Sequence, residues 1–295
     1  MRRAECCRPP FYYDTDLETH LNMNKKTFLT LIALTALLTV EAQQHRTVQF
    51  FAHRGSRLEY DENTMPAFRA TYDKGIRGYE TDIRMTADGR LVVTHDSSLK
   101  RLTPCDGEVE KMTAKQIRAV KTNQGNDILF LDELCRWLAD KEGMYVEFEM
   151  KTSSPAYDEQ QLERYCDLLY TTAMKHKPAS STYLFTSSDK RALRTMQRLH
   201  PDADLLLIIG RPISDDTIRE ALDMGIKRLG CTMGGTSRDA VAKAKKAGLF
   251  VSLWPGQSID DFILGVALGA DALCCDRAVE VKEFFDEHMP WVEAR

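Results

Sequence analysis

Several features that mark common classes of protein are missing from this sequence. None of its eight cysteines forms a C-x-x-C pair, which argues against a zinc ribbon or a thioredoxin-like redox site. Lysine and arginine are scattered along a chain of net charge −4, which argues against nucleic acid as a partner. The uncharged apolar run at 28–40 has 13 residues, fewer than a membrane-spanning helix requires. What remains is 295 residues, 43% of them hydrophobic, enough for one large globular domain or two small ones.

The first 45 residues differ in character from the rest. A short basic segment at 23–26 precedes the apolar run, and Val40 and Ala42 are placed like the small residues of a cleavage site. This pattern predicts a signal peptide at 23–42, cleaved near Ala42, and export to the periplasm or the cell exterior. An uncleaved N-terminal anchor is the alternative. The polar stretch 1–22 has no clear period, and we interpret it as an unstructured gene-start extension, with translation beginning at Met23.

Export would place the mature chain in an oxidising compartment. Most of the cysteines nevertheless lie inside apolar segments, where a free thiol behaves as a small hydrophobic group. We therefore predict buried thiols rather than a disulfide framework.

From residue 46 onward, strand-like apolar runs alternate with helix-like amphipathic runs. The predicted strands are 48–53, 79–84, 145–150, 182–186, 205–209, 228–231, 250–254 and 272–274. The predicted helices are 65–74, 131–140, 159–175, 190–200, 215–224, 237–247, 259–268 and 279–287. Eight strands that are each followed by a helix predict an α/β fold, a (β/α)8 TIM barrel over 46–290. An open doubly wound sheet is the main competitor.

One further strand, 91–94, interrupts this alternation. The dipeptide Asp88-Gly89 predicts a hairpin with the preceding strand. With a two-residue loop, Ala87 would face Arg90 and Asp82 would lie opposite His95. The segment at about 97–126 then forms an insertion after the second strand, where such segments commonly shape the mouth of an active site.

Carboxylates and an amine repeat with period two on two predicted strands. Glu80 and Asp82 point to one face of the second strand, and Glu147, Glu149 and Lys151 to one face of the next. Buried together, such carboxylates require a cation or a shared proton. Oxygen ligands without a cysteine or a histidine cluster favour Mg²⁺ or Ca²⁺, with Zn²⁺ less favoured. An acidic outer face on a surface strand is the alternative.

Two histidines and an arginine stand at strand ends near these carboxylates. His53 ends the first strand and His95 ends the hairpin, and imidazole suits proton transfer near neutral pH. Arg54 offers a planar donor fork for a phosphate or a carboxylate, although an ion pair at the barrel rim would also explain it.

These segments together resemble the glycerophosphodiester phosphodiesterase family over about 48–278. The ordered motifs are H-R-G at 53–55, E-N-T at 62–64, E-T-D at 80–82, T-x-D-G-x-L-V-V-T-H-D at 86–96 and E-x-K at 149–151. The resemblance implies a TIM barrel and metal-dependent hydrolysis of glycerophosphodiesters to glycerol 3-phosphate and an alcohol. Glu62 matches the glutamate of E-N-T, which we place behind the site, and Glu147 matches nothing.

The resemblance also implies roles for seven residues. The catalytic histidines are His53 and His95, the metal ligands Glu80, Asp82 and Glu149, and the phosphate-binding cations Arg54 and Lys151. We add Trp254, at a strand end, as a residue that stacks on the substrate; a core tryptophan is the other interpretation.

The late part of the chain departs from the family's pattern. W-P-G at 254–256 stands where W-T-x-N is common, and C-D-R-A at 275–278 where T-D-x-P is common. These changes leave the alcohol group of the substrate open. The rival hypotheses are a lysophospholipase D-like enzyme on the same barrel, a non-catalytic protein that binds glycerophospho compounds, and an enolase-like or sugar-directed barrel enzyme.

Overall fold

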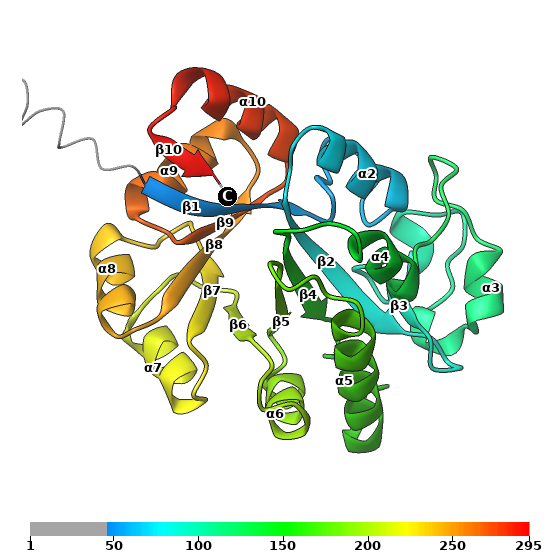
Figure 1. Cartoon of the computed structure of the whole chain (residues 1–295). Coiled ribbons are helices and arrows are strands. Elements are labelled where there is room, and N and C mark those ends of the chain that lie inside the picture. The colour runs from blue at the N-terminus through cyan, green and yellow to red at the C-terminus, as the bar shows by residue number, and fades with distance from the viewer. Residues whose placement is uncertain (1–45, 295) are drawn as a thin grey trace, which may run out of the picture. The chain divides into compact units, whose positions relative to one another are not determined.

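Eight parallel strands close into a barrel in the computed structural model, which describes residues 46–294 (Figure 1). Its strands are β1 (Arg46–His53), β2 (Gly78–Met85), β4 (Tyr145–Met150), β5 (Thr182–Ser187), β6 (Leu205–Ile209), β7 (Arg228–Thr232), β8 (Phe250–Gly256) and β9 (Ala272–Cys275). Strand β1 pairs with both β9 and β2, which closes the ring. The predicted (β/α)8 barrel is confirmed and the open doubly wound sheet is excluded. The predicted signal peptide and gene-start extension lie outside the described residues.

A helix follows each barrel strand and covers its outer side. These helices are α2 (Met65–Asp73), α4 (Leu131–Leu138), α5 (Glu159–Met174), α6 (Lys190–Leu199), α7 (Asp215–Asp223), α8 (Arg238–Lys246), α9 (Ile259–Leu268) and α10 (Ala278–His288). Helix α4 shows why they pack: it buries Leu131, Leu134, Cys135 and Leu138, one stripe of a 3.6-residue period. In the described part of the chain, no helix is both long and apolar enough to cross a membrane.

The hairpin forms, but its register differs by one residue from the prediction. Strand β3 (Leu91–Val93) pairs Met85 with Leu91 and Ile83 with Val93, and the Thr94 amide donates to the carbonyl of Asp82 at 2.9 Å. The loop has three residues rather than two, and Gly89 adopts φ 80°, as a three-residue hairpin loop requires. Because β3 ends at Val93, His95 lies beyond the ladder and is free to turn toward the barrel.

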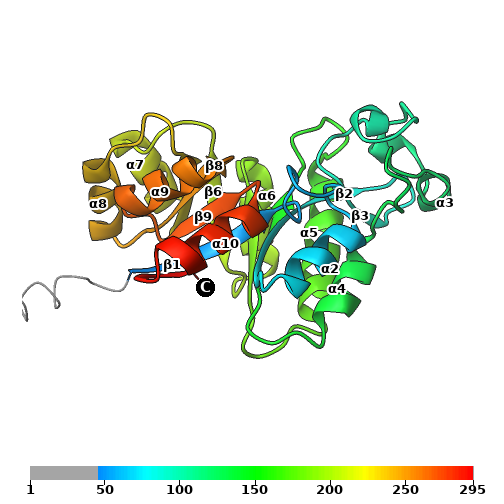
Figure 2. The same cartoon turned by 90° about the horizontal axis from the view of Figure 1, so that it is seen from above.

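The insertion after β3 contains structure of its own. It holds two short 3-10 helices, η1 (Leu99–Arg101) and η2 (Val109–Lys111), and the helix α3 (Ala114–Arg118). A separate apolar cluster fixes it against the barrel; its members include Val92, Leu99, Val109, Ile117 and Phe130. Figure 2 shows α3 standing out to one side of the barrel beyond β3. A last short strand, β10 (Val292–Ala294), pairs with the start of β1.

The cysteines bear out the prediction of free thiols. All six in the described residues are free; five are buried and Cys105 is half-buried. Burial raises the pKa of Cys135 to about 12, which keeps that thiol protonated and unreactive.

Candidate active site

A tight turn at the end of β1 brings two consecutive side chains to the same cavity. Neighbouring residues on a strand point to opposite faces, so His53 and Arg54 could not both face inward on a regular strand. The strand ends at His53, and Arg54 and Gly55 adopt φ 54° and 76°. The Ser56 amide then bonds back to the His53 carbonyl at 2.9 Å. A Cβ on Gly55 would lie 3.1 Å from the Cβ of Ala67, so both the conformation and the space favour glycine.

Three carboxylates converge beside this turn. Glu80 and Asp82 come from β2 and Glu149 from β4, where the strand register pairs Asp82 with Glu149. One oxygen from each lies within 4.8 Å of the others. Glu80 Oε1 and Asp82 Oδ1 are buried and accept no hydrogen bond from the described residues. Buried acceptors without a hydrogen bond are rare inside proteins, and a bound cation would satisfy Glu80 Oε1 as well as Asp82 Oδ1, whose charge is met by Lys151 at 3.2 Å.

The charges of this cluster shift the pKa values of Glu80 and Asp82, the two carboxyls of β2, in opposite directions. Burial, with Asp82 and Glu149 close by, raises the pKa of Glu80 well above its usual value. Burial would also raise the pKa of Asp82, but Lys151 and Arg54 outweigh it and lower that pKa. Glu80 therefore keeps its proton to higher pH than Asp82 does.

Both cations predicted to bind phosphate are ion-paired to the carboxylates. Arg54 Nε lies 3.1 Å from Asp82 Oδ2, and its Nη1 lies 3.1 Å from Glu62 Oε1. Lys151 Nζ lies 2.6 Å from Glu149 Oε1 and 3.2 Å from Asp82 Oδ1. Glu62 thus stands behind Arg54, as predicted, and the site holds its positive charge in place before any substrate arrives.

Each histidine is held from behind by an aspartate. His53 Nδ1 lies 2.5 Å from Asp276 Oδ1, and His95 Nδ1 lies 2.6 Å from Asp96 Oδ1. Arg57 also donates to Asp276, at 2.8 and 2.6 Å. Such a pair fixes the ring's tautomer and turns Nε2 toward the cavity. In the substrate-free protein the Nε2 of His53 accepts a hydrogen bond from Arg54 Nε at 3.1 Å. Sequence reasoning missed both aspartates as partners, although T-H-D and C-D-R-A had each been singled out as motifs.

We expect Asp276→Asn to lower kcat about 10- to 100-fold, the range for groups that orient a functional side chain, with little change in KM. The amide cannot stabilise a positive imidazole as the carboxylate does. Arg57→Gln is the matched control, because it removes the other partner of Asp276 and leaves the carboxylate on His53. Wild-type kcat in Asp276→Asn, in protein that unfolds at the wild-type temperature, would contradict this role.

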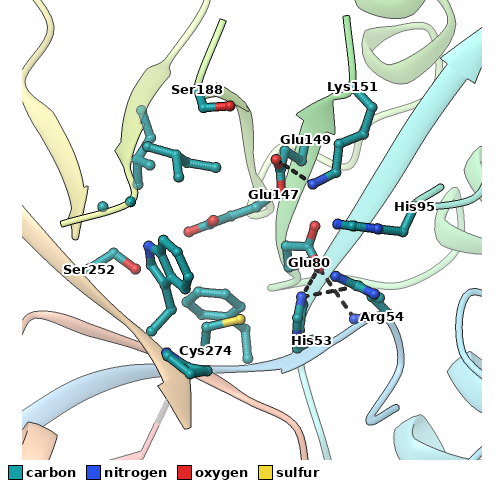
Figure 3. A pocket seen from close by; sticks show the side chains of 17 residues that line it. His53, Arg54, Glu80, His95, Glu147, Glu149, Lys151, Ser188, Ser252 and Cys274 are labelled. Atoms are coloured by element: carbon teal, nitrogen blue, oxygen red, sulfur yellow. Dashed lines mark hydrogen bonds and ion pairs between the residues drawn. The ribbon is translucent and has the colours of Figure 1, made fainter. Parts of the chain in front are cut away.

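The side chains surround a cavity of about 310 Å³ at the open end of the barrel (Figure 3). His53, Arg54, Glu80 and His95 line one side of it, and Glu149 and Lys151 lie above them. Trp254 lines the cavity as well, and it also packs against the cluster of Phe51, Tyr145, Leu184, Ala272 and Cys274 inside the barrel. Trp254 thus lies both at the cavity wall and against the core, and its stacking on the substrate stays a prediction.

Glu147 lies deeper in the barrel than Glu149 and is buried. It accepts a hydrogen bond from the Tyr145 hydroxyl at 2.5 Å, and burial raises its pKa from 4.5 to about 7. The folded protein therefore keeps this proton at pH values where the unfolded chain has lost it. The free energy of unfolding falls as the pH rises from 4.5 to about 7.

Glu147→Gln should remove this pH dependence. Between pH 5 and pH 8, the metal-free wild type should lose about 2 kcal/mol more stability than the variant does. Urea unfolding of both proteins in chelator at the two pH values gives the difference directly, because all other titrating groups are shared. Equal losses would show that Glu147 titrates normally.

Fold and site together define the class of protein: a barrel enzyme whose acid, base and charged groups gather at the carboxyl ends of the strands. The model of the Glycerophosphoryl diester phosphodiesterase family matches residues 53–280. The chain belongs to this family and is an enzyme of it, as the ordered motifs predict.

Curated relatives agree. A glycerophosphodiester phosphodiesterase from Caldanaerobacter subterraneus is 25% identical over 234 residues, which cover 76% of this chain and 92% of the relative. A glycerophosphodiester phosphodiesterase from Bacillus altitudinis is 28% identical over 170 residues, which cover 54% of this chain and 66% of the relative. An uncharacterised Bacillus subtilis protein is 32% identical over 37% of this chain, and the match spans about half of that relative's length.

Solved structures show the same fold. A Silicibacter pomeroyi protein described as a glycerophosphoryl diester phosphodiesterase superposes with a TM-score of 0.77 at 21% identity, covering 87% of this chain and 99% of its own. An Oleispira antarctica phosphodiesterase, solved with the product sn-glycerol-3-phosphate, gives 0.74 at 22% identity and covers 81% and 97%.

Proposed function

We propose that this chain hydrolyses glycerophosphodiesters to glycerol 3-phosphate and an alcohol, with the help of one divalent cation. The observation that carries the proposal is the cavity itself. It joins two aspartate-backed histidines, two cations and a cluster of three carboxylates in about 310 Å³. Family membership supports the substrate class, and so does the product complex of the Oleispira relative.

The cation site we propose consists of Glu80, Asp82 and Glu149. Three convergent carboxylates with two orphaned oxygens fit a hard ion, Ca²⁺ or Mg²⁺. When bound, such an ion supplies positive charge to a phosphate oxygen and to a hydroxyl of the substrate. Asp82 is ionised and Glu80 would release its proton on binding, since metal ligands bind deprotonated.

Arg54 and Lys151 would bind the phosphate. A phosphodiester is an anion, and its transfer depends on positioning and charge stabilisation rather than on covalent help from the protein. The ion pairs of both cations with Asp82 hold them beside the cavity, so little reorganisation is needed when the phosphate arrives.

His53 and His95 would move the protons. One takes the proton of the glycerol 2-hydroxyl as its oxygen bonds to phosphorus, and the other gives a proton to the alcohol oxygen as its bond to phosphorus breaks. Water then attacks the cyclic phosphate, the bond to the 2-oxygen breaks, and the two histidines exchange roles. Their aspartate partners stabilise the imidazolium form in either step.

The surroundings favour a short, polar substrate over a lysophospholipid. Next to the cavity, on the side of the insertion, lies a basin of about 510 Å³. Its walls are polar or charged, and Arg84, Ser98, Lys100 and Arg101 are among them. An acyl chain would find no apolar groove in this basin on the insertion side, whereas a hydroxylated or charged group would remain hydrated there.

A release assay tests the proposal. Glycerophosphocholine, glycerophosphoethanolamine and glycerophosphoglycerol are each incubated with the protein, with and without chelator, and glycerol 3-phosphate is measured. We expect release from at least one of them, abolished by chelator and restored by added Ca²⁺ or Mg²⁺. Release of choline from lysophosphatidylcholine, with no glycerol 3-phosphate from any of the three diesters, would favour the rival activity.

We further propose that the protein is exported, on the pattern of the segment 23–42. Expression of the full chain followed by mass measurement of the exported protein tests this. Cleavage near Ala42 should yield a mature chain that begins close to Gln43. A product that remains in the cytoplasm at full mass would contradict it.

A further inference from the structure

The cavity does not end at the carboxylate cluster. It continues to the other side of the barrel, where β6 to β9 supply Leu206, Ile208, Gly230, Ser252, Trp254 and Cys274. Gly230 and Ser252 are direct neighbours in the β7–β8 register, and both are small. A Cβ on Gly230 would lie 2.9 Å from Leu206 Cδ2, so the glycine makes room for the Leu206 side chain that lines the cavity. We call this far side of the cavity, lined by these six residues, the chamber.

Glu147 is the acidic group of the chamber. It comes from β4, two residues before Glu149, but in Figure 3 its carboxyl points away from Lys151 and His95, toward the side where Ser252 lies. No lysine, arginine or histidine of the described residues forms an ion pair with it. The nearest arginine, Arg228, is held by both oxygens of Asp204 at 2.8 and 2.7 Å.

A buried carboxyl without a countercharge is costly. Among the described residues, the Tyr145 hydroxyl is the one hydrogen-bond partner of the Glu147 carboxyl; it satisfies one oxygen and supplies no charge. Arg228 acts on Glu147 only through its charge. The chamber wall adds two aromatic side chains, Trp254 and Phe51. A carboxyl and aromatic faces around one space are the groups that recognise an ammonium ion.

We propose that Glu147 and the chamber bind a positively charged alcohol group of the substrate, so that the enzyme prefers diesters of amino alcohols. This rests on the proposed function, because the phosphate must lie between His53 and His95 for the alcohol to reach the chamber. The ammonium group supplies a countercharge to Glu147 and lies against the ring face of Trp254. Glu147 is then a specificity-determining residue outside the cation site.

The test compares kcat/KM for glycerophosphoethanolamine and glycerophosphocholine with kcat/KM for the uncharged glycerophosphoglycerol. In the wild type we expect the two cationic diesters to be preferred. Glu147→Gln keeps the shape and the acceptor for Tyr145 but removes the charge, and should lower the preference ratio about tenfold. Trp254→Leu, at the mouth, serves as the second variant and should lower the same ratio.

Equilibrium binding of the same three diesters by calorimetry, in the presence of Ca²⁺ or Mg²⁺, gives a readout that does not need turnover. A wild type that releases no glycerol 3-phosphate from any diester overturns the proposed function, and the binding ratio then decides this inference alone. A ratio that Glu147→Gln leaves unchanged, or equal kcat/KM and affinity for all three diesters in the wild type, would overturn the role of Glu147.

Discussion

Replacing His95 by alanine is expected to lower kcat/KM by about 10³-fold, within the range for loss of a positioned acid or base. Replacing His53 should have a similar effect, and the double variant should cost little more than either single one, since the two act in one concerted transfer. His288→Ala is the matched control, because that ring is exposed and lies at the last residue of α10. Near-wild-type turnover in both single variants would refute two-histidine catalysis.

An activated leaving group separates the two roles. A nitrophenyl ester of glycerol 3-phosphate releases an alcohol that needs no proton, so the variant that lacks the general acid should recover most of its rate on this substrate. The variant that lacks the base should stay slow. Recovery in His53→Ala would identify His53 as the general acid, and recovery in His95→Ala would identify His95. Recovery in neither variant would indicate a mechanism without a general acid.

Replacing Glu80 by glutamine is expected to lower kcat by about 10³-fold or more, because the proposed cation would stabilise the charge of the transition state by several kcal/mol. The same change should stabilise the metal-free protein. Burial and the repulsion of Asp82 and Glu149 raise the pKa of Glu80, so its ionisation opposes folding above the ordinary carboxyl range. Glutamine removes that opposition while keeping the size of the side chain.

Thermal unfolding with and without metal makes this prediction sharp. At 100 times its Kd a bound ion adds about 2.7 kcal/mol to the wild type, and this gain should vanish in Glu80→Gln. Glu108→Gln, at the exposed residue just before η2, is the matched control. An equal metal-induced rise in unfolding temperature for wild type and Glu80→Gln would remove Glu80 from the cation site.

Local pattern was enough to predict the barrel and most of the cavity. Strand periodicity placed Glu80, Asp82 and Glu149 on one inner surface, because the alternation of side chains along a strand is fixed by backbone geometry. Helix starts follow local rules as well: Ser237 and Asp189 accept backbone hydrogen bonds from the first turns of the helices they precede. Both depend only on residues close together in sequence.

What failed depended on distance or on loop geometry. Asp276 lies 223 residues from His53, and only the closure of the barrel through β1 and β9 brings them into contact. The hairpin register slipped because the turn used a third residue, and nothing in Asp88-Gly89 alone separates a two-residue loop from a three-residue one. For the same reason, the sequence alone did not predict which groups surround the Glu147 carboxyl.

The ion pairs of Lys151 and Arg54 with Asp82 and Glu149 imply thermodynamic linkage between cofactor and substrate. A divalent ion bound to these carboxylates would leave Lys151 without its anionic partners and Arg54 with Glu62 alone, and the phosphate would replace what they lost. Each ligand should then tighten the affinity for the other by the same factor. Titrating the protein with either one alone would report weaker association than it meets during turnover.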